Sequence, residues 1–137
     1  MDVNRFGPQT HGLLRIVTAL LLLLHSTSKL FNFPPFGMPV PVGSLLWIAG
    51  VIELVFGLLL IVGLLSRISA FILSGEMAVA YWMFHAPKST FPSQNQGEVA
   101  ILFCFIFLFI AATGPGAWSI DASRKARVTT VESPDAG

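Results

Sequence analysis

The stretch Leu45–Leu65, LLWIAGVIELVFGLLLIVGLL, most constrains what this chain can fold into. Its 21 residues are apolar except for Glu53 near the middle. As a helix it would be roughly 31 Å long, about the thickness of the hydrocarbon core of a bilayer. We therefore interpret it as a membrane span. A carboxylate at that depth is costly and is usually kept for a task, so Glu53 is the first candidate site residue.

The composition extends this interpretation to the whole chain. Of its 137 residues, 54% are hydrophobic and only 11% are charged, and the mean hydropathy is +0.76. These values indicate one small integral membrane domain. The net charge of +1, with no basic stripe, argues against nucleic acid as a partner. The one cysteine, Cys104, excludes dithiol chemistry within a single subunit.

Apolar runs and breaker residues predict an all-α fold, an antiparallel four-helix transmembrane bundle. A flexible tail (1–10) precedes a membrane domain (11–121), and a disordered tail (122–137) follows it. The expected spans are about 11–31, 45–65, 68–85 and 98–113, with loops rich in proline between the first two and the last two. The link Ser66-Arg67 is short enough to require a helical hairpin. The early leucine run resembles a signal peptide, but the HSTSK that follows offers no cleavage site, which favours a retained span.

Four spans place both termini on the same side of the membrane. The positive-inside rule makes that side cytoplasmic, because the tails and the short link carry most of the cations: Arg5, Arg67, Arg124, Lys125 and Arg127. The opposite side has Lys29 and Lys88. The three tryptophans fall near span ends, as expected of residues at the lipid–water interface.

Ionisable residues recur within these spans and are expected to converge. By helical rise, His25, Glu53 and Glu76 lie near the midplane, since each is roughly 13–15 Å from a span end. Four more polar side chains lie above them towards the outer surface: Lys29, Tyr81, His85 and Glu98. We expect these groups to turn away from lipid and to form a polar pocket in the outer half of the bundle.

Each candidate also has a structural interpretation. Glu53 could belong to an internal ion pair, and His25 could make a purely structural hydrogen bond. Lys29, Glu98 and His85 could simply reach the headgroup region. A metal site built from the histidines and carboxylates is not favoured, because no single helix carries ligand spacing such as HExxH.

Two features of the spans bear on packing. Gly50 and Gly57 lie seven residues apart and predict close approach of a neighbouring helix. Glu76 and His85, nine residues apart, would point to opposite sides of a straight helix. Both can face one pocket only if the helix bends, for which Gly75 is a candidate, or if one of them faces a partner subunit. Arg15 is expected to be a cytoplasmic anchor.

The order of these motifs resembles the DoxX family of small four-helix membrane proteins. The resemblance covers about residues 12–121 and rests on Arg15, His25-x-x-x-Lys29-Leu30-Phe31, Gly50-x-x-Glu53-x-x-x-Gly57, Gly63-Leu64-x-x-Arg67, Glu76-Met77-x-x-Ala80, His85, Asn95-x-Gly97-Glu98 and Gly114-Pro115-Gly116 with Ser119 and Asp121. The family commonly has His-Gly where this chain has His25-Ser26, a change that would narrow the space between helices there.

The resemblance implies a bacterial inner-membrane protein similar to quinone-linked redox subunits. Glu53, His25 and Glu76 would then be catalytic, Lys29, Tyr81, His85 and Glu98 would bind quinone, and Gly50, Gly57, Arg15 and Arg67 would be structural. No haem, flavin or metal motif is evident, so electrons would come from a soluble or membrane redox partner or a small reductant. A homo-oligomer is compatible with this scheme. The alternative is a non-catalytic assembly or scaffold subunit, and a small-molecule or proton carrier is a third, less favoured reading.

Overall fold

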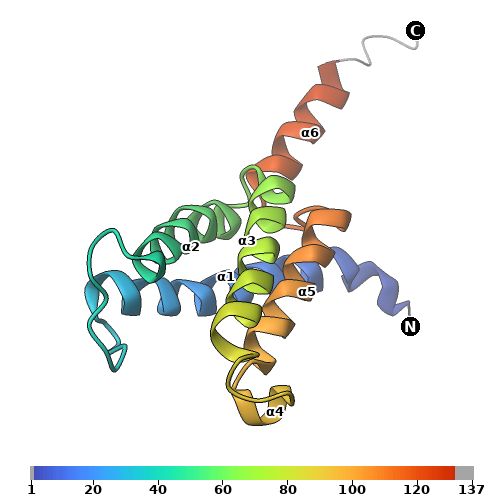
Figure 1. Ribbon diagram of the computed structural model, residues 1–137. Coiled ribbons are helices and arrows are strands. Elements are labelled where there is room, and N and C mark those ends of the chain that lie inside the picture. Colours follow the sequence, from blue (N-terminus) through green and yellow to red (C-terminus); the bar gives the residue numbers. More distant parts are fainter. Residues whose placement is uncertain (1, 132–137) are drawn as a thin grey trace, which may run out of the picture.

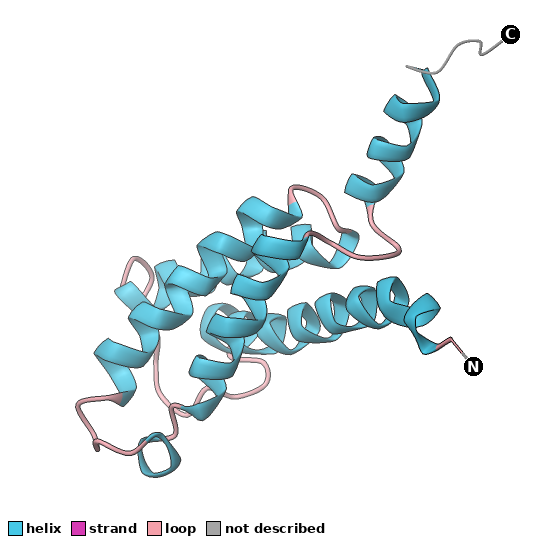
Figure 2. Cartoon of the chain, turned by 90° about the vertical axis from the view of Figure 1, so that its right-hand side faces the viewer, coloured by secondary structure: helices cyan, strands magenta, loops and turns pink. Residues whose placement is uncertain are grey.

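The computed structural model describes residues 2–131, and no strand occurs among them (Figure 2). The all-α prediction is confirmed. The helical elements are η1 (Val3–Phe6), α1 (Gly7–Phe31), α2 (Leu45–Val62), α3 (Ser66–Ala80), η2 (Tyr81–His85), α4 (Pro92–Asn95), α5 (Glu98–Thr113) and α6 (Ile120–Val131). The four expected spans correspond to α1, α2, α3 continued by η2, and α5.

These helices form two pairs. α1 packs along α2, and α3 packs along α5, while α2 joins the pairs through its contact with α3. α1 has little contact with α5. Figure 1 shows the α1–α2 pair crossing the α3–α5 pair rather than running parallel to it. The two pairs therefore meet along α2 and α3 and leave space between them elsewhere.

The apolar residues are distributed as a membrane protein requires. A small core joins the helices, with Leu22, Leu60, Leu73, Phe107 and Ile110 fully buried. Many other large apolar side chains point outward from the same helices, among them Leu13, Leu20, Leu24, Ile68, Phe71, Leu102 and Phe105. Among residues 2–131, two helices are long and apolar enough to cross a membrane, Val3–Phe31 and Leu45–Val62, and the apolar helix Glu98–Thr113 is shorter. Four crossings and the side of the termini stay predictions.

The helix boundaries follow local chemistry. The Ser44 hydroxyl caps α2 by accepting a hydrogen bond from the Trp47 N–H at 3.3 Å. Asn32 ends α1 in the left-handed conformation. α2 ends at Val62 because Gly63 adopts φ +71°, and Leu65 is also left-handed. The connection between α2 and α3 is therefore Gly63–Leu65, not Ser66-Arg67, because Ser66 already begins α3.

Both expected tails differ from the structure where it describes them. The segment 1–10, predicted to be flexible, contains η1 and the first residues of α1. The segment 122–137, predicted to be disordered, continues α6 as far as Val131; the rest lies outside the described residues. The reason for α6 is local, since the Ser119 hydroxyl accepts from the Ala122 N–H at 3.1 Å and Asp121 lies in the first turn.

The irregular turn in the third span lies after Gly75, the residue at which the sequence suggested a bend. Around Gly75 the chain is regular α-helix, whereas Tyr81–His85 forms one π-helical turn, with the Ala86 N–H donating to the Tyr81 carbonyl at 2.9 Å. A π turn inserts an extra residue and so rotates everything that follows it around the helix axis. This rotation decides where His85 points.

Candidate functional site

A cavity of about 1020 Å³ lies between the two helix pairs. Its walls come from α1, α2, α3, η2, α5 and the loop at Gly37. Most of the wall is apolar, with Leu22, Ile52, Ile72, Met77 and Phe103 among its residues. Its ionisable wall residues include five of the predicted site residues: His25, Lys29, Glu53, Glu76 and His85. The expected convergence of polar side chains from separate helices is therefore present.

An ion pair joins α1 to α2 at the cavity wall. Lys29 Nζ lies 2.7 Å from Glu53 Oε1, and the side chain of Glu53 is only 1% exposed. Gly50 permits this approach, because a Cβ there would lie 3.1 Å from the Lys29 Cβ. The other carboxylate oxygen of Glu53, Oε2, is buried and has no hydrogen-bond partner among residues 2–131. One acceptor therefore stays available beside the pair.

Ser26 links α1 to α2. This side chain, which stands where the family commonly has glycine, is fully buried, and its hydroxyl donates to the Gly50 carbonyl at 2.8 Å. Where a glycine would make no side-chain contact, the small hydroxyl of Ser26 thus forms a hydrogen bond between the two helices. Gly57 supports the pair further along α2, where a Cβ would lie 3.0 Å from Leu23.

Glu76 differs from Glu53 in having no cation bonded to it. Both of its carboxyl oxygens are buried, and neither has a hydrogen-bond partner within the described part of the chain. It lies on α3 and lines the same cavity as the Lys29–Glu53 pair. A buried carboxyl group without partners is expensive unless a proton or a ligand donor satisfies it. Glu76 is therefore the wall group best placed to exchange a proton or bind a donor.

The two histidines reach the cavity in different ways. His25, on α1, packs edge-on against Phe103 with ring centroids 6.0 Å apart. His85 lies in the π turn, and its Nδ1 is 3.0 Å from the Asn95 carbonyl. Because a carbonyl only accepts, Nδ1 carries the proton and Nε2 of the neutral ring is an acceptor. The π turn brings His85 to the same cavity as Glu76, so no partner subunit is needed to reconcile them.

Tyr81 and Glu98, predicted to bind quinone, do not line the cavity. The Tyr81 ring lies against Gly97, where an added Cβ would approach within 2.5 Å, and its hydroxyl accepts from the Asn95 amide at 3.4 Å. Glu98 is exposed at the start of α5. The reason is rotational, because the directions of these two side chains depend on the π turn and on the loop before α5, which their positions along a helix do not predict.

Asn95 is a site-supporting residue to which sequence reasoning assigned no role. Its side chain is 1% exposed, donates to the Ser89 carbonyl at 2.9 Å and accepts from the Gly97 N–H at 2.8 Å. Its carbonyl also fixes His85. The available signal was the pattern Asn95-x-Gly97, in which a short amide side chain bonds its own loop.

The opposite end of the helix pairs is closed by the segment 114–121. Arg15, expected to be an anchor at the membrane surface, is fully buried; its guanidinium donates to the carbonyls of Pro115, Ala117 (3.2 Å) and Trp118 (2.8 Å). Arg67 donates to the carbonyls of Ala111 and Ala112 at the end of α5. Both arginines therefore hold backbone carbonyls, as a structural role requires.

Asp121 ties the segment 114–121 to the turn between α2 and α3. Its carboxylate accepts from the N–H groups of Leu65 (3.0 Å) and Ser66 (2.8 Å), and its own N–H donates to the Gly63 carbonyl at 2.9 Å. Partial burial alone would raise the pKa of Asp121, but these bonds and the nearby charge of Arg124 outweigh it and hold the pKa below its ordinary value. Sequence reasoning quoted Asp121 without assigning it this role.

The cavity combines a mostly apolar wall with a few ionisable groups. Within residues 2–131, no three His, Cys, Asp or Glu side chains come together to hold a metal. The cavity offers apolar walls, two lysines (Lys29 and Lys88), two carboxyl groups and two imidazoles. Pockets of this kind bind small organic molecules and orient them by a few hydrogen bonds.

Comparison with known proteins agrees with the sequence pattern. The family model described as DoxX matches residues 12–86. A Haemophilus influenzae protein, described as uncharacterized, is 43% identical over 126 residues, which cover 88% of this chain and 94% of that protein. No solved structure matches the chain significantly.

Proposed function

Because this chain belongs to the DoxX family of membrane proteins, we propose that it is a quinone-binding subunit of a membrane oxidoreductase. The observation that carries the proposal is the cavity of about 1020 Å³ whose apolar wall is interrupted by Lys29, Glu53, Glu76 and the two histidines. A quinone needs that combination, since its ring is apolar and its two carbonyls accept hydrogen bonds.

In this proposal, different wall residues bind the quinone and transfer protons to it. Reduction of a quinone takes up two electrons and two protons. Lys29 donates hydrogen bonds to a ring carbonyl, while Glu53 holds the Lys29 ammonium in place at 2.7 Å. Glu76, whose oxygens have no partner within residues 2–131, carries the proton that one carbonyl receives. His25 hydrogen-bonds the ligand from α1, and Nε2 of His85 accepts and passes on a proton.

The electrons come from a soluble or membrane redox partner or from a small reductant. The chain itself has no haem or flavin motif, and its one thiol, Cys104, has no second cysteine in the chain to pair with. In this proposal the protein resides in a bacterial plasma membrane with both termini cytoplasmic. Hydrogen bonding supports a shared side for the ends of the membrane domain, since the Ala117 N–H donates to the Pro8 carbonyl at 2.9 Å.

One observation favours the second candidate, a non-catalytic scaffold subunit. The Lys29–Glu53 pair joins α1 to α2, and the positive and negative charges of the two side chains largely neutralise each other. Groups that pair in this way can serve only to fix the orientation of two helices. In that case the outward-facing apolar surface would carry the function, by contact with a partner complex.

Quinone binding to Glu76 variants tests the proposal. We expect purified protein in detergent to bind a short-tailed benzoquinone or naphthoquinone, and Glu76→Gln to weaken binding about tenfold, because the protonated carboxyl donor is replaced by a weaker amide donor. Binding is measured by quenching of tryptophan fluorescence. Glu98→Gln is the matched control, since it removes an exposed carboxylate outside the cavity.

Two results would count against quinone binding. One is equal affinity in Glu76→Gln and Glu98→Gln. The other is absence of binding by the wild type, together with loss of a membrane complex when the gene is deleted. The second result would favour the scaffold function.

A further inference from the structure

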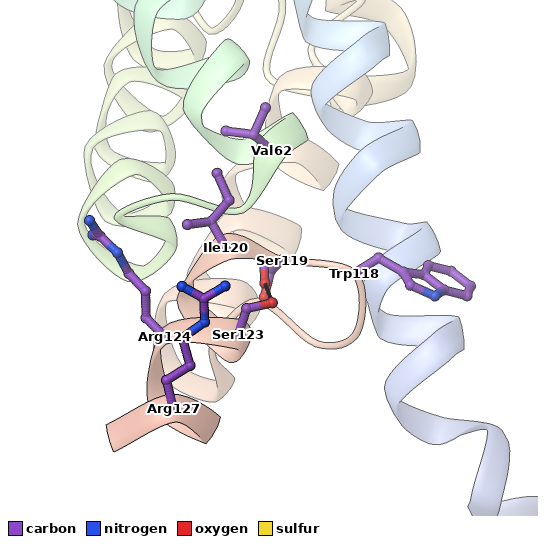
Figure 3. A pocket seen from close by; sticks show the side chains of 7 residues that line it. All are labelled: Val62, Trp118, Ser119, Ile120, Ser123, Arg124 and Arg127. Carbon is purple, nitrogen blue, oxygen red and sulfur yellow. Dashed lines mark hydrogen bonds between the residues drawn. The ribbon is translucent and has the colours of Figure 1, made fainter. Parts of the chain in front are cut away.

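A second pocket, of about 480 Å³, lies where the segment 114–121 passes into α6. Three of its lining residues lie on α6: Ser123, Arg124 and Arg127. Ser119, which precedes α6, also lines it. Figure 3 shows the Arg127 guanidinium beside Ser123, whereas the Arg124 side chain extends towards the start of α3. Their spacing of three residues keeps them on one face of the helix.

Within the described residues, the nearby carboxylate of Asp121 offsets part of the Arg124 charge, and the positive charge of Arg127 has no ion-pair partner. Neither Arg124 nor Arg127 forms a hydrogen bond or an ion pair there, since the pair found in residues 2–131 is Lys29–Glu53. Asp121, three residues before Arg124, is occupied by the N–H groups of Leu65 and Ser66. An anion in the pocket would therefore meet two guanidinium groups whose donors are available.

The wall next to the arginines is apolar and faces outward. Val62, at the end of α2, and Ile120 line the same pocket, and both are more than 40% exposed. Val62 continues into the outward-facing apolar surface of α2. Trp118, on the same segment, is exposed and extends away from the arginines (Figure 3). An exposed tryptophan beside arginines is typical of the headgroup level of a membrane.

We propose that this pocket binds the phosphate of an anionic phospholipid. Arg124 and Arg127 hold the phosphate oxygens, and Val62 and Ile120 contact the first part of the acyl chains. The positive charge of the arginines favours an anion, and the apolar wall beside them favours an anion with attached hydrocarbon chains. The site is separate from the cavity between the helix pairs and does not depend on what that cavity binds.

Native mass spectrometry of the full chain tests this site. The detergent-purified protein is mixed with phosphatidylglycerol or with phosphatidylcholine, and the retained lipid is counted. We expect preferential retention of phosphatidylglycerol, weakened about fivefold by Arg127→Gln and further by the double variant with Arg124→Gln. Arg127→Lys keeps the charge and should recover part of the loss, which separates lipid binding from misfolding.

Lys125→Gln is the matched control. It removes the same charge from the same helix, but Lys125 does not line the pocket, so we expect less than about a twofold effect. An equal loss in Lys125→Gln and Arg127→Gln would overturn the site, because the attraction would then be diffuse. Displacement of the lipid by an equal concentration of inorganic phosphate would also overturn it, by assigning the pocket to a free anion.

Discussion

At the scale of single residues, polar side chains fall into two groups with different neighbours. Arg15, Arg67 and Asp121 have backbone groups as partners: Arg15 and Asp121 fasten the segment 114–121 to the helices, and Arg67 holds the end of α5. Glu53 and Glu76 instead retain oxygens without partners at a cavity wall. Buried acceptors without a partner are costly, so the free oxygens of Glu53 and Glu76 point to a ligand or a bound proton. The hydrogen bonds of Arg15, Arg67 and Asp121 instead explain the fold.

Asp121→Asn tests the first group through its pH dependence. Because the folded state lowers the pKa of Asp121, the unfolded state binds more protons, and stability rises with pH. The contribution is present above the ordinary pKa of 3.8 and is lost as the pH falls through the lower folded-state value. We expect Asp121→Asn to cost about 1 kcal/mol at neutral pH, discounted for exposure.

Thermal unfolding in detergent at pH 7 and pH 3 measures this difference. The gap between wild type and Asp121→Asn should shrink at the lower pH. Asp2→Asn is the control, because Asp2 is an exposed carboxylate that bonds only its own turn, through Asn4; it should change stability by less than about 0.5 kcal/mol. A pH-independent gap would contradict the assigned role of the Asp121 charge.

At the scale of elements, the turn between α2 and α3 determines how the two pairs meet. Gly63 has φ +71°, and a Cβ there would overlap the Ser119 side chain. The turn therefore needs glycine for two reasons, a left-handed backbone and contact with the segment 114–121. The π turn Tyr81–His85 has a comparable effect at the other end, because it orients His85.

Gly63→Ala should destabilise the protein by about 2–4 kcal/mol, the sum of left-handed strain and overpacking. Gly75→Ala is the matched control, since Gly75 is exposed on α3 with no atom within 4 Å of an added Cβ. It should be neutral or stabilising by about 0.5–1 kcal/mol. Denaturant unfolding in mixed micelles measures both. Equal effects would show that the close approach at Gly63 is not needed.

At the scale of the whole molecule, the crossing of two helix pairs creates the cavity. Four parallel helices would fill their centre with side chains, whereas pairs that meet along α2 and α3 leave an open space beyond that contact (Figure 1). Its volume of about 1020 Å³ lies at the upper end of ligand sites.

Ala49→Phe should fill part of this space from α2. We expect about tenfold weaker quinone binding with little change in unfolding temperature, because Ala49 lines the cavity rather than the core. Val55→Phe, on the outward surface of the same helix, is the control and should change neither quantity. Quinone titration and thermal unfolding of the three proteins provide the comparison. Unchanged affinity in Ala49→Phe would place the ligand elsewhere.

The sequence by itself determined the helical class, the four main helices and the identity of the ionisable residues along them. Hydropathy, breaker residues and helical rise are properties of a segment and its neighbours, so Glu53, Glu76 and His25 could be chosen without coordinates. Only the tertiary structure decided which of them meet. A change in helix rotation or crossing redirects a side chain without changing its depth, and the π turn therefore brought His85 into the cavity while Tyr81 and Glu98 stayed outside it.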